Sequence, residues 1–212
     1  MVFVKIVLIL VLCKTVRSEC VGKSRLVCMD DDYDKTELPE KYSPTPVTVS
    51  VHVDEVLEIN DQESSLSISG YFNVGWADQR LGTDKMTSGA SQLMDIELLG
   101  EIWKPDIYIY NLLAFEEETL QSTITRVEKK DKQLYMDKMR NIFLQQKVKL
   151  KINCPMDLSM FPFDRHTCKL RVGSYSNNDS KMKFRTEDVG GNTQSGANKI
   201  NFDVCKLSNN EH

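Results

Sequence analysis

Beyond its first twenty residues, the 212-residue sequence contains no apolar run that approaches the length of a membrane span, no internal repeat and no Gly/Ser linker. A helix that crosses a bilayer needs about 20 consecutive apolar residues, so we predict that no segment of this chain crosses a membrane. A chain of this length without a linker or a repeat fits one large domain.

Sequence features of enzymes and metal sites are also missing. No ordered set of Ser, His and Asp, no paired acidic motif and no Gly-rich phosphate loop is present. The three histidines are scattered and no two cysteines form a CxxC pair, which argues against zinc. The formal charge of −4 and the pI near 5.5 argue against nucleic acid as a partner. We therefore predict a protein that is not an enzyme and that uses no metal or cofactor.

The first residues have the composition of a secretory signal peptide. A lysine precedes the apolar run 6–12, which is too short to span a bilayer, and the small residue Ser18 offers a cleavage point. We predict that residues 1–18 are a signal peptide and that the mature chain begins near Glu19, outside the cell.

Secretion permits disulfides and N-glycosylation. Removal of Cys13 with the signal peptide would reduce the six cysteines to five, an odd number, so at least one is free or pairs with another chain. Asn178 is followed by Asp179 and Ser180, the pattern of an N-glycosylation acceptor. Asn178 is therefore a candidate glycosylation site.

From residue 46 onward, apolar and polar residues alternate with a period of two. The apolar phases lie within residues 47–53, 66–76, 107–109, 148–152 and 170–172. This alternation is typical of half-buried antiparallel strands, and short strands separated by turns predict an all-β, immunoglobulin-like β-sandwich. We assign the sandwich to residues 47–212 and the preceding residues 19–46 to an acidic arm or a short helix.

Three tyrosines fall on the polar phases of three of these predicted strands. Tyr71 is in phase with serines, Tyr110 with Tyr108, and Tyr175 with a lysine and an arginine. Tyrosine often packs at a sandwich edge with its hydroxyl in water. The pattern by itself allows that interpretation and also an aromatic binding surface.

One segment is more specific than the strand pattern. The thirteen residues between Cys154 and Cys168 carry the pattern Cys-Pro-Met-x-Leu-x-x-Phe-Pro-Phe-Asp. A crosslink that closes a loop of this size typically stabilises a protein by about 3 kcal/mol. Any secreted sandwich could contain such a bond, but that alone does not account for the residues inside the loop.

This pattern resembles the characteristic loop of the Cys-loop receptors, a family that includes nicotinic acetylcholine, GABA, glycine and serotonin channels and the soluble acetylcholine-binding proteins. The segment 76–78, Trp-Ala-Asp, followed by Arg80 and Leu81, resembles the Trp-x-Asp motif of the family. The segment 103–106, Trp-Lys-Pro-Asp, resembles its Trp-x-Pro-Asp motif. The resemblance runs from about Pro46 to the C-terminus.

The resemblance implies a pentameric ring of identical or homologous subunits, with a ligand held between neighbours. The implied contacts are Tyr110 and Tyr175 on one face, and Tyr71, Leu134 and Met136 on the other. Several aromatic faces can bind an ammonium group without a salt bridge, so we expect a small cationic or amino-acid-like ligand. Asn73 stands where members that bind transmitter carboxylates often have Arg, which argues against glycine or GABA.

The resemblance also bears on the cysteines. It implies a Cys154–Cys168 disulfide, while a local bridge between Cys20 and Cys28 is a further expectation and Cys205 is left as the unpaired thiol. Compared with the family, we expect the sandwich to lack the C-terminal ligand-capping hairpin, the last strand and the four membrane helices.

The apex of the disulfide loop is an apolar run at a position where a soluble protein is usually polar. Its residues are Met160, Phe161, Pro162 and Phe163. In channel members of the family the corresponding apex contacts the membrane domain, although these side chains could instead fold back under their own sandwich.

We therefore predict the extracellular ligand-binding domain of a channel subunit, incomplete at its C-terminus. The alternatives are a secreted protein like the acetylcholine-binding proteins and a structural β-sandwich that binds no ligand.

Overall fold

The structure, a computed structural model, describes residues 19–21, 27–29, 32–82, 91–94, 96–117, 123–132, 137–161, 163–186 and 199–208. Within these ranges the regular elements are β-strands and one 3-10 helix, η1 (Ile96–Gly100). The prediction of an all-β chain is confirmed. No helix in the described ranges is long and apolar enough to span a bilayer.

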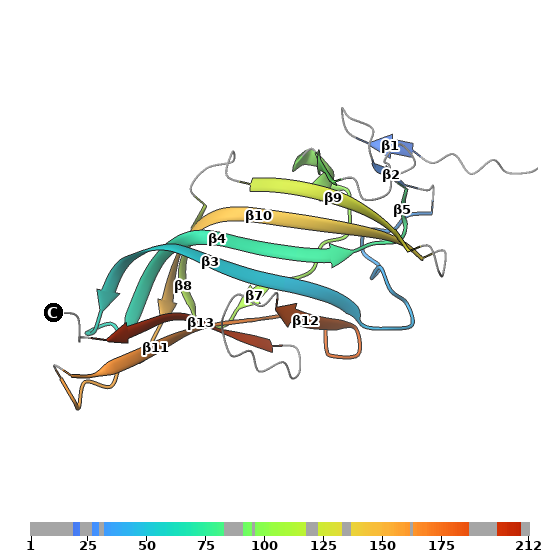
Figure 1. The fold of residues 1–212 in the computed structure, drawn as a ribbon. Coiled ribbons are helices and arrows are strands. Elements are labelled where there is room, and N and C mark those ends of the chain that lie inside the picture. Colours follow the sequence, from blue (N-terminus) through green and yellow to red (C-terminus); the bar gives the residue numbers. More distant parts are fainter. Residues whose placement is uncertain are drawn as a thin grey trace, which may run out of the picture.

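The larger layer of the sandwich is a seven-stranded sheet with the order β12–β3–β4–β10–β9–β6, in which β8 also pairs with β10 (Figure 1). Its long central strands are β3 (Thr45–Asn60), β4 (Ser65–Ala77) and β10 (Asp137–Asn153). Its other strands are β6 (Ser91–Met94), β8 (Leu112–Glu117), β9 (Thr123–Lys132) and β12 (Met182–Thr186). All of these pairs are antiparallel except β12 with β3.

The second layer is a three-stranded sheet with the order β13–β11–β7, seen below the long strands in Figure 1. It consists of β7 (Tyr108–Ile109), β11 (Arg165–Gly173) and β13 (Lys199–Ser208). A third, small sheet is formed by β1 (Glu19–Val21), β2 (Val27–Met29) and β5 (Leu81–Gly82). The predicted sandwich is therefore present, and β13 is paired along β11.

The core follows the predicted alternation. In β4 the even-numbered residues from Leu66 to Trp76 are buried, and in β3 Val47 and Val49 are fully buried. β10 and β11 also contribute to the buried cluster, through Ile142, Val148, Leu150, Ile152, Cys168, Leu170 and Val172. The period-two pattern thus identified the buried face of each of these strands.

A disulfide joins the two layers. It links Cys154, directly after β10, to Cys168 in β11, with a Cα–Cα separation of 5.1 Å. Both cysteines are buried in the core. The predicted Cys154–Cys168 pairing is confirmed.

Gly70, in the middle of β4, is required by a close approach of the neighbouring strand. A Cβ at this position would lie 2.1 Å from the carbonyl oxygen of His52. The β3–β4 register shifts at this point, between Val53 and Glu55. Such a bulge brings one backbone close to another, and only glycine fits there without displacement.

The described residues before β3 contain no helix. They form β1, β2 and, from Asp32 to Pro44, turns and irregular backbone. Tyr33 attaches this segment to the sandwich: its hydroxyl donates to Asp78 Oδ2 (3.0 Å) and accepts from the backbone N–H of Trp103 (2.9 Å). Burial, followed by the effect of the Asp78 charge, raises the pKa of Tyr33 to about 12, although the hydrogen bond from Trp103 opposes this.

Arg80 completes this attachment. Its guanidinium binds the fully buried Asp78 carboxylate through Nε (2.9 Å) and Nη2 (2.8 Å) and donates to the carbonyl of Asp34 (2.9 Å). It also lies 4.6 Å from the centroid of the Tyr33 ring, a cation–π distance. The Trp-Ala-Asp motif and Arg80 therefore hold the N-terminal segment against the sandwich.

Candidate functional site

Three tyrosines come together where β7 meets the end of β11. The rings of Tyr108 and Tyr110 are 5.1 Å apart and nearly perpendicular, and the rings of Tyr108 and Tyr175 are 5.8 Å apart. All three remain accessible to solvent, and Tyr175 is 82% exposed. They form an open aromatic surface, which we call the tyrosine cluster.

Backbone contacts place two of these rings. Tyr110 lies in the turn after β7 rather than on a strand, and its N–H donates to the carbonyl of Arg171 (2.8 Å). Its hydroxyl donates to the carbonyl of Ser174 (2.9 Å). Tyr175 lies in a bend two residues beyond the end of β11. The predicted strand positions of Tyr110 and Tyr175 were therefore wrong, because both strands end just before these residues.

Asn111 fixes the turn that contains Tyr110. Its side-chain amide donates to the carbonyls of Asn153 (2.9 Å) and Lys169 (2.8 Å), and its side-chain oxygen accepts from the N–H of Arg171 (3.0 Å). One side chain thus bridges β10 in the larger sheet and β11 in the smaller one. This bridging holds the tyrosine cluster at a constant position relative to both layers.

Asp106 organises the bend that contains Tyr175. Its carboxylate accepts from the Ser174 hydroxyl (2.7 and 2.8 Å), the N–H of Tyr175 (3.2 Å) and the N–H of Ser176 (2.8 Å). It also accepts from the Ser176 hydroxyl (2.6 Å) and the Asn177 side chain (2.9 Å). Partial burial disfavours the charge, but these hydrogen bonds outweigh it and lower the pKa of Asp106 to about 2.

An open cavity of about 600 Å³ adjoins Asp106 on the side of the N-terminal segment. Residues 36–38 and 40–41 form one wall, and Trp103 and Lys181 contribute to others. None of the three tyrosines lines this cavity. The tyrosine cluster is thus separate from this cavity, and its rings are exposed on the surface of a single chain.

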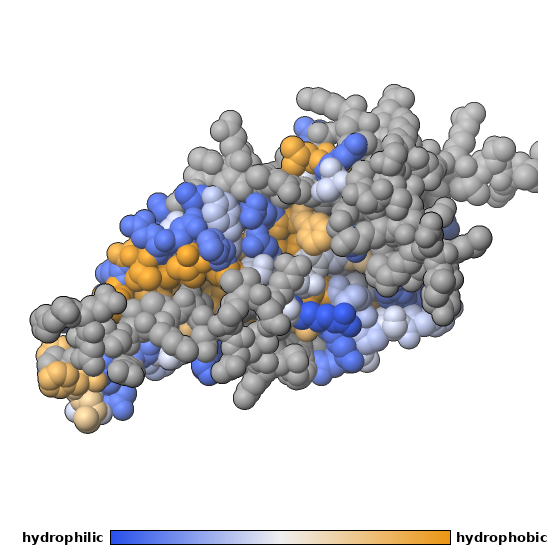
Figure 2. All heavy atoms as spheres, viewed as in Figure 1, coloured by the Kyte–Doolittle hydropathy of each residue, from blue (hydrophilic) through white to orange (hydrophobic). Residues whose placement is uncertain are grey.

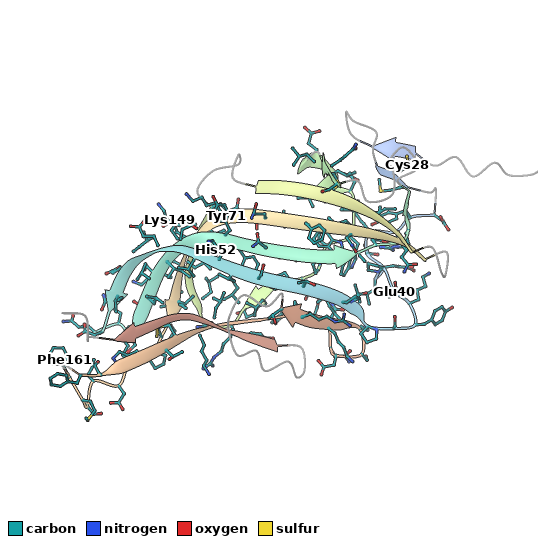
Figure 3. All side chains as sticks on the ribbon, viewed as in Figure 1. Cys28, Glu40, His52, Tyr71, Lys149 and Phe161 are labelled. Carbon is teal, nitrogen blue, oxygen red and sulfur yellow. A yellow bond between two sulfur atoms is a disulfide. The ribbon has the colours of Figure 1, made fainter. Side chains whose placement is uncertain are left out.

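Tyr71 lies apart from the tyrosine cluster. It belongs to β4 in the larger sheet, where it pairs with His52 on one side and Lys147 on the other. Its neighbours Gly70 and Phe72 belong to the buried phase, so Tyr71 faces away from the core. Figure 3 shows Tyr71 with His52 and Lys149 on the outer side of this sheet. Within one chain the core separates Tyr71 from the tyrosine cluster.

Two of the predicted contacts, Leu134 and Met136, lie outside the described residues. Asn178 is exposed in the turn before β12, where its side-chain oxygen accepts from the Ser180 hydroxyl (2.6 Å). Its glycosylation stays a prediction.

The apex of the disulfide loop projects from one end of the molecule. Met160, Phe161 and Phe163 are each about 70% exposed, with fractions of 68, 71 and 71%. Figure 3 shows Phe161 at the far end of the sandwich, and Figure 2 shows an apolar group at the same end. These three side chains do not fold back under the sandwich; Pro162 lies outside the described residues.

Sequence reasoning missed two members of this region. Tyr108 was placed on the same side as Tyr110 but was not included as a contact, whereas its ring is the one that touches both other rings. Asp106 was considered only as the last residue of the Trp-x-Pro-Asp motif, and its partners lie about 70 residues later in the chain. The run of Ser174, Ser176 and Asn177 beside Tyr175 was the available signal, because their hydroxyl and amide groups can donate hydrogen bonds to a carboxylate.

The described residues contain no group of three or more His, Cys, Asp or Glu side chains arranged to hold a metal ion. The chemistry of the cluster is instead that of three ring faces beside a fixed carboxylate. Such a surface suits a cationic group, which ring faces attract through their quadrupole.

Comparison with known proteins identifies similar sequences. The family model described as "neurotransmitter-gated ion-channel ligand binding domain" matches residues 24–211. Gamma-aminobutyric acid receptor subunit rho-3 of Homo sapiens is 28% identical over 142 residues, which is 66% of this chain and 28% of that protein. Gamma-aminobutyric acid receptor alpha-like of Drosophila melanogaster is 28% identical over 144 residues, 67% of this chain and 19% of that protein.

The betaine receptor acr-23 of Caenorhabditis elegans is 28% identical over 157 residues, 73% of this chain and 28% of that protein. These relatives are receptor subunits rather than enzymes. The chain spans between 19 and 28% of the length of these three relatives.

Proposed function

The chain belongs to the family of neurotransmitter-gated ion-channel ligand-binding domains, and from that premise we propose that it binds a small cationic or amino-acid-like ligand as the extracellular part of a channel subunit. It is not an enzyme. The observation that carries the proposal is the tyrosine cluster, in which the accessible ring of Tyr108 lies 5.1 Å from that of Tyr110 and 5.8 Å from that of Tyr175.

The chemistry of the cluster favours an ammonium group. A cation over one aromatic face gains roughly 0.5 to 2 kcal/mol, depending on how far both are desolvated. Tyr175, the most exposed ring, is held by a bend that Asp106 fixes through hydrogen bonds. A fixed backbone beneath the ring reduces the ordering that ligand binding requires. The cluster is therefore suited to bind a cation before any closure of the site.

We place the second half of the site on a neighbouring subunit. Tyr71 is on the outer face of the larger sheet, on the other side of the core from the cluster. A ring of subunits brings such opposite faces together at each interface, so a complete site would contain the cluster of one chain and Tyr71 of the next. Leu134 and Met136 remain proposed members of that second face. The proposed assembly is a pentamer of identical or homologous chains.

The ligand is proposed from the same chemistry. The relatives are named for gamma-aminobutyric acid and for betaine, two small compounds with a cationic nitrogen and a carboxylate. Asn73, in the position where an arginine would suit a carboxylate, instead donates to the Ser50 hydroxyl (3.2 Å). This difference weighs against gamma-aminobutyric acid and leaves the cationic end of the ligand as the part that the tyrosines would recognise.

The apex of the disulfide loop supports a channel subunit over a soluble binding protein. Met160, Phe161 and Phe163 expose adjacent large apolar side chains, and such patches usually mark an interface. We propose that this apex, with Pro162, contacts membrane-embedded helices in the assembled protein. The alternative of a secreted binding protein would leave these side chains in water.

Calorimetric titration of the secreted protein with betaine and with tetramethylammonium tests the binding proposal. Tyr175→Ala should weaken binding about 5- to 100-fold, and Tyr175→Phe much less, because the ring face carries the interaction. Tyr42→Ala, a fully exposed tyrosine outside the cluster, is the matched control. Equal losses for Tyr175→Ala and Tyr175→Phe would indicate a hydroxyl hydrogen bond instead, and no binding of either cation by the wild-type protein would refute the proposed ligand class.

A further inference from the structure

A cavity separate from the tyrosine cluster lies where the N-terminal segment meets the sandwich. Its volume is about 600 Å³, within the range of about 300–1,000 Å³ that is usual for small-molecule sites. Residues between 36 and 43, the Trp-Lys-Pro-Asp motif and the turn before β12 contribute to its lining. Figure 3 shows Glu40, one of the lining residues, toward the end of the sandwich opposite Phe161. The cavity is thus remote from the loop apex for which we propose a contact with membrane-embedded helices.

The apolar part of the lining is held in place by the fold. Leu38 is half-buried and packs against the core. Trp103 is buried, and its ring meets that of Trp76 edge-on, with 6.5 Å between the centroids. The backbone N–H of Trp103 is bound to the Tyr33 hydroxyl (2.9 Å). Because the fold already fixes these residues, little ordering opposes the binding of an apolar group beside them.

The acidic side chains of the lining have partners of their own. Glu37 forms an ion pair with Lys41 (3.0 Å), and Glu40 accepts from the side chain of Gln79 (3.2 Å). The carboxylate of Asp106 accepts from hydroxyl and N–H groups of the bend after β11. Donors and cations beside a carboxylate offset part of its charge, so these three acids repel a bound anion less than free carboxylates would.

Two lysines of the lining differ from Lys41 in this respect. Across the described ranges, the ammonium groups of Lys104 and Lys181 take part in no ion pair or hydrogen bond. Both residues are exposed at the cavity, one in the Trp-Lys-Pro-Asp motif and the other directly before β12. An ammonium group is a compact cation with three donors, and a carboxylate can accept from it. The charge that the cavity offers to a ligand is therefore positive.

We propose that this cavity binds a small organic anion that combines a carboxylate with an apolar body. Lys104 and Lys181 bind the carboxylate, while Leu38 and Trp103 contact the apolar body. An inorganic anion would leave the apolar part of the lining uncovered, and a neutral apolar molecule would leave both ammonium groups without a partner. The ligand has the opposite charge to the one proposed for the tyrosine cluster, and the two sites share no tyrosine.

The two sites are nevertheless adjacent through one structural element. Asp106, Ser176 and Asn177 line the cavity, and the same three residues belong to the hydrogen-bonded bend that presents Tyr175. An anion bound in the cavity therefore lies beside the residues that position Tyr175, whereas Tyr175 itself is not part of the lining.

Fluorine NMR of the full chain with 4-fluorobenzoate tests the proposal, because the probe's signal broadens when it binds to a protein. The matched probe is 4-fluorobenzamide, which has the same ring without the negative charge. At low ionic strength, where exposed charges are least screened, 4-fluorobenzoate should bind about 3- to 20-fold more tightly than the amide. Equal binding of the two probes, or no binding of 4-fluorobenzoate, would overturn the proposal.

Substitution of the two lysines locates the bound probe. Lys104→Gln and Lys181→Gln should each weaken binding of 4-fluorobenzoate about two- to fivefold, because one exposed ion pair is lost, and should not affect the amide. Lys183→Gln is the matched control, at an exposed lysine of β12 that does not line the cavity. All three side chains are exposed, so folding should be retained. An equal loss in Lys183→Gln would show that the anion follows surface charge in general, and the proposed site would be wrong.

A competition experiment separates this site from the tyrosine cluster. Tetramethylammonium chloride, the salt of a cation proposed to bind the cluster, should displace no more 4-fluorobenzoate than the same concentration of sodium chloride. Specific displacement by tetramethylammonium would place the anion at the cluster and would contradict the cavity site. Neither result depends on whether the cluster binds the cation with measurable affinity, because the lysine substitutions are read from the anion alone.

Discussion

Replacement of Asp106 tests whether one carboxylate holds the bend that presents Tyr175. In Asp106→Ala the Ser174 hydroxyl, which is buried, loses both of its carboxylate contacts at 2.7 and 2.8 Å. A buried polar group left without its partner costs about 1–3 kcal/mol. The N–H groups of Tyr175 and Ser176 are on exposed residues, where water can replace the carboxylate as acceptor. Losing these hydrogen bonds therefore adds little to the destabilisation.

The expected loss for Asp106→Ala is therefore about 2–3 kcal/mol in the free energy of unfolding. Asp106→Asn should cost about 1 kcal/mol, because its one oxygen can still accept from two N–H groups while the Ser174 hydroxyl turns to accept. Glu97→Ala, at an exposed carboxylate in η1, is the matched control and should change stability by less than about 0.5 kcal/mol.

Urea denaturation followed by tryptophan fluorescence measures these differences, since Trp103 lies three residues before Asp106. Hydrogen exchange of the amides of residues 174–177 should also accelerate in Asp106→Ala more than elsewhere in the sandwich. A loss below about 0.5 kcal/mol, with unchanged exchange in 174–177, would refute the view that Asp106 organises this bend.

Three further predictions concern the stability and the solubility of the protein. Tyr33→Phe removes the hydroxyl that binds Asp78 and should lower the free energy of unfolding by about 1–2 kcal/mol. Tyr42→Phe, at a fully exposed position, should not change it. Equal effects of the two substitutions would contradict the proposed attachment of the N-terminal segment by Tyr33. The pKa of Asp106 is lowered from 3.8 to about 2, so its stabilisation is present above pH 4 and is lost as the pH falls toward 2. The difference in urea midpoint between wild type and Asp106→Asn should shrink over that interval, and a constant difference from pH 5 to 2 would disprove the assignment. Phe163→Ser should raise the solubility of the chain without loss of folding, because the side chain is exposed. An unfolded variant would show instead that Phe163 supports the core.

Much of the fold could be predicted from the sequence, because a strand with one buried face repeats its apolar residues with a period of two. The buried even-numbered residues of β4, from Leu66 to Trp76, follow this local rule. The Cys154–Cys168 disulfide and the family came from a contiguous motif that can be recognised without any knowledge of the fold. These features depend on residues that are close together in the chain.

What the sequence by itself determined was therefore which residues are buried, where the loop is closed and to which family the chain belongs. The tertiary structure alone decided which distant side chains meet. Asp106 meets its partners about 70 residues later, and Tyr108 joins Tyr175 only because β7 pairs with the end of β11. In the same way, the cavity brings Leu38, Lys104 and Lys181 together. The periodicity of each strand specifies its faces but not its neighbours, because strand pairing and register arise from packing of the whole sandwich.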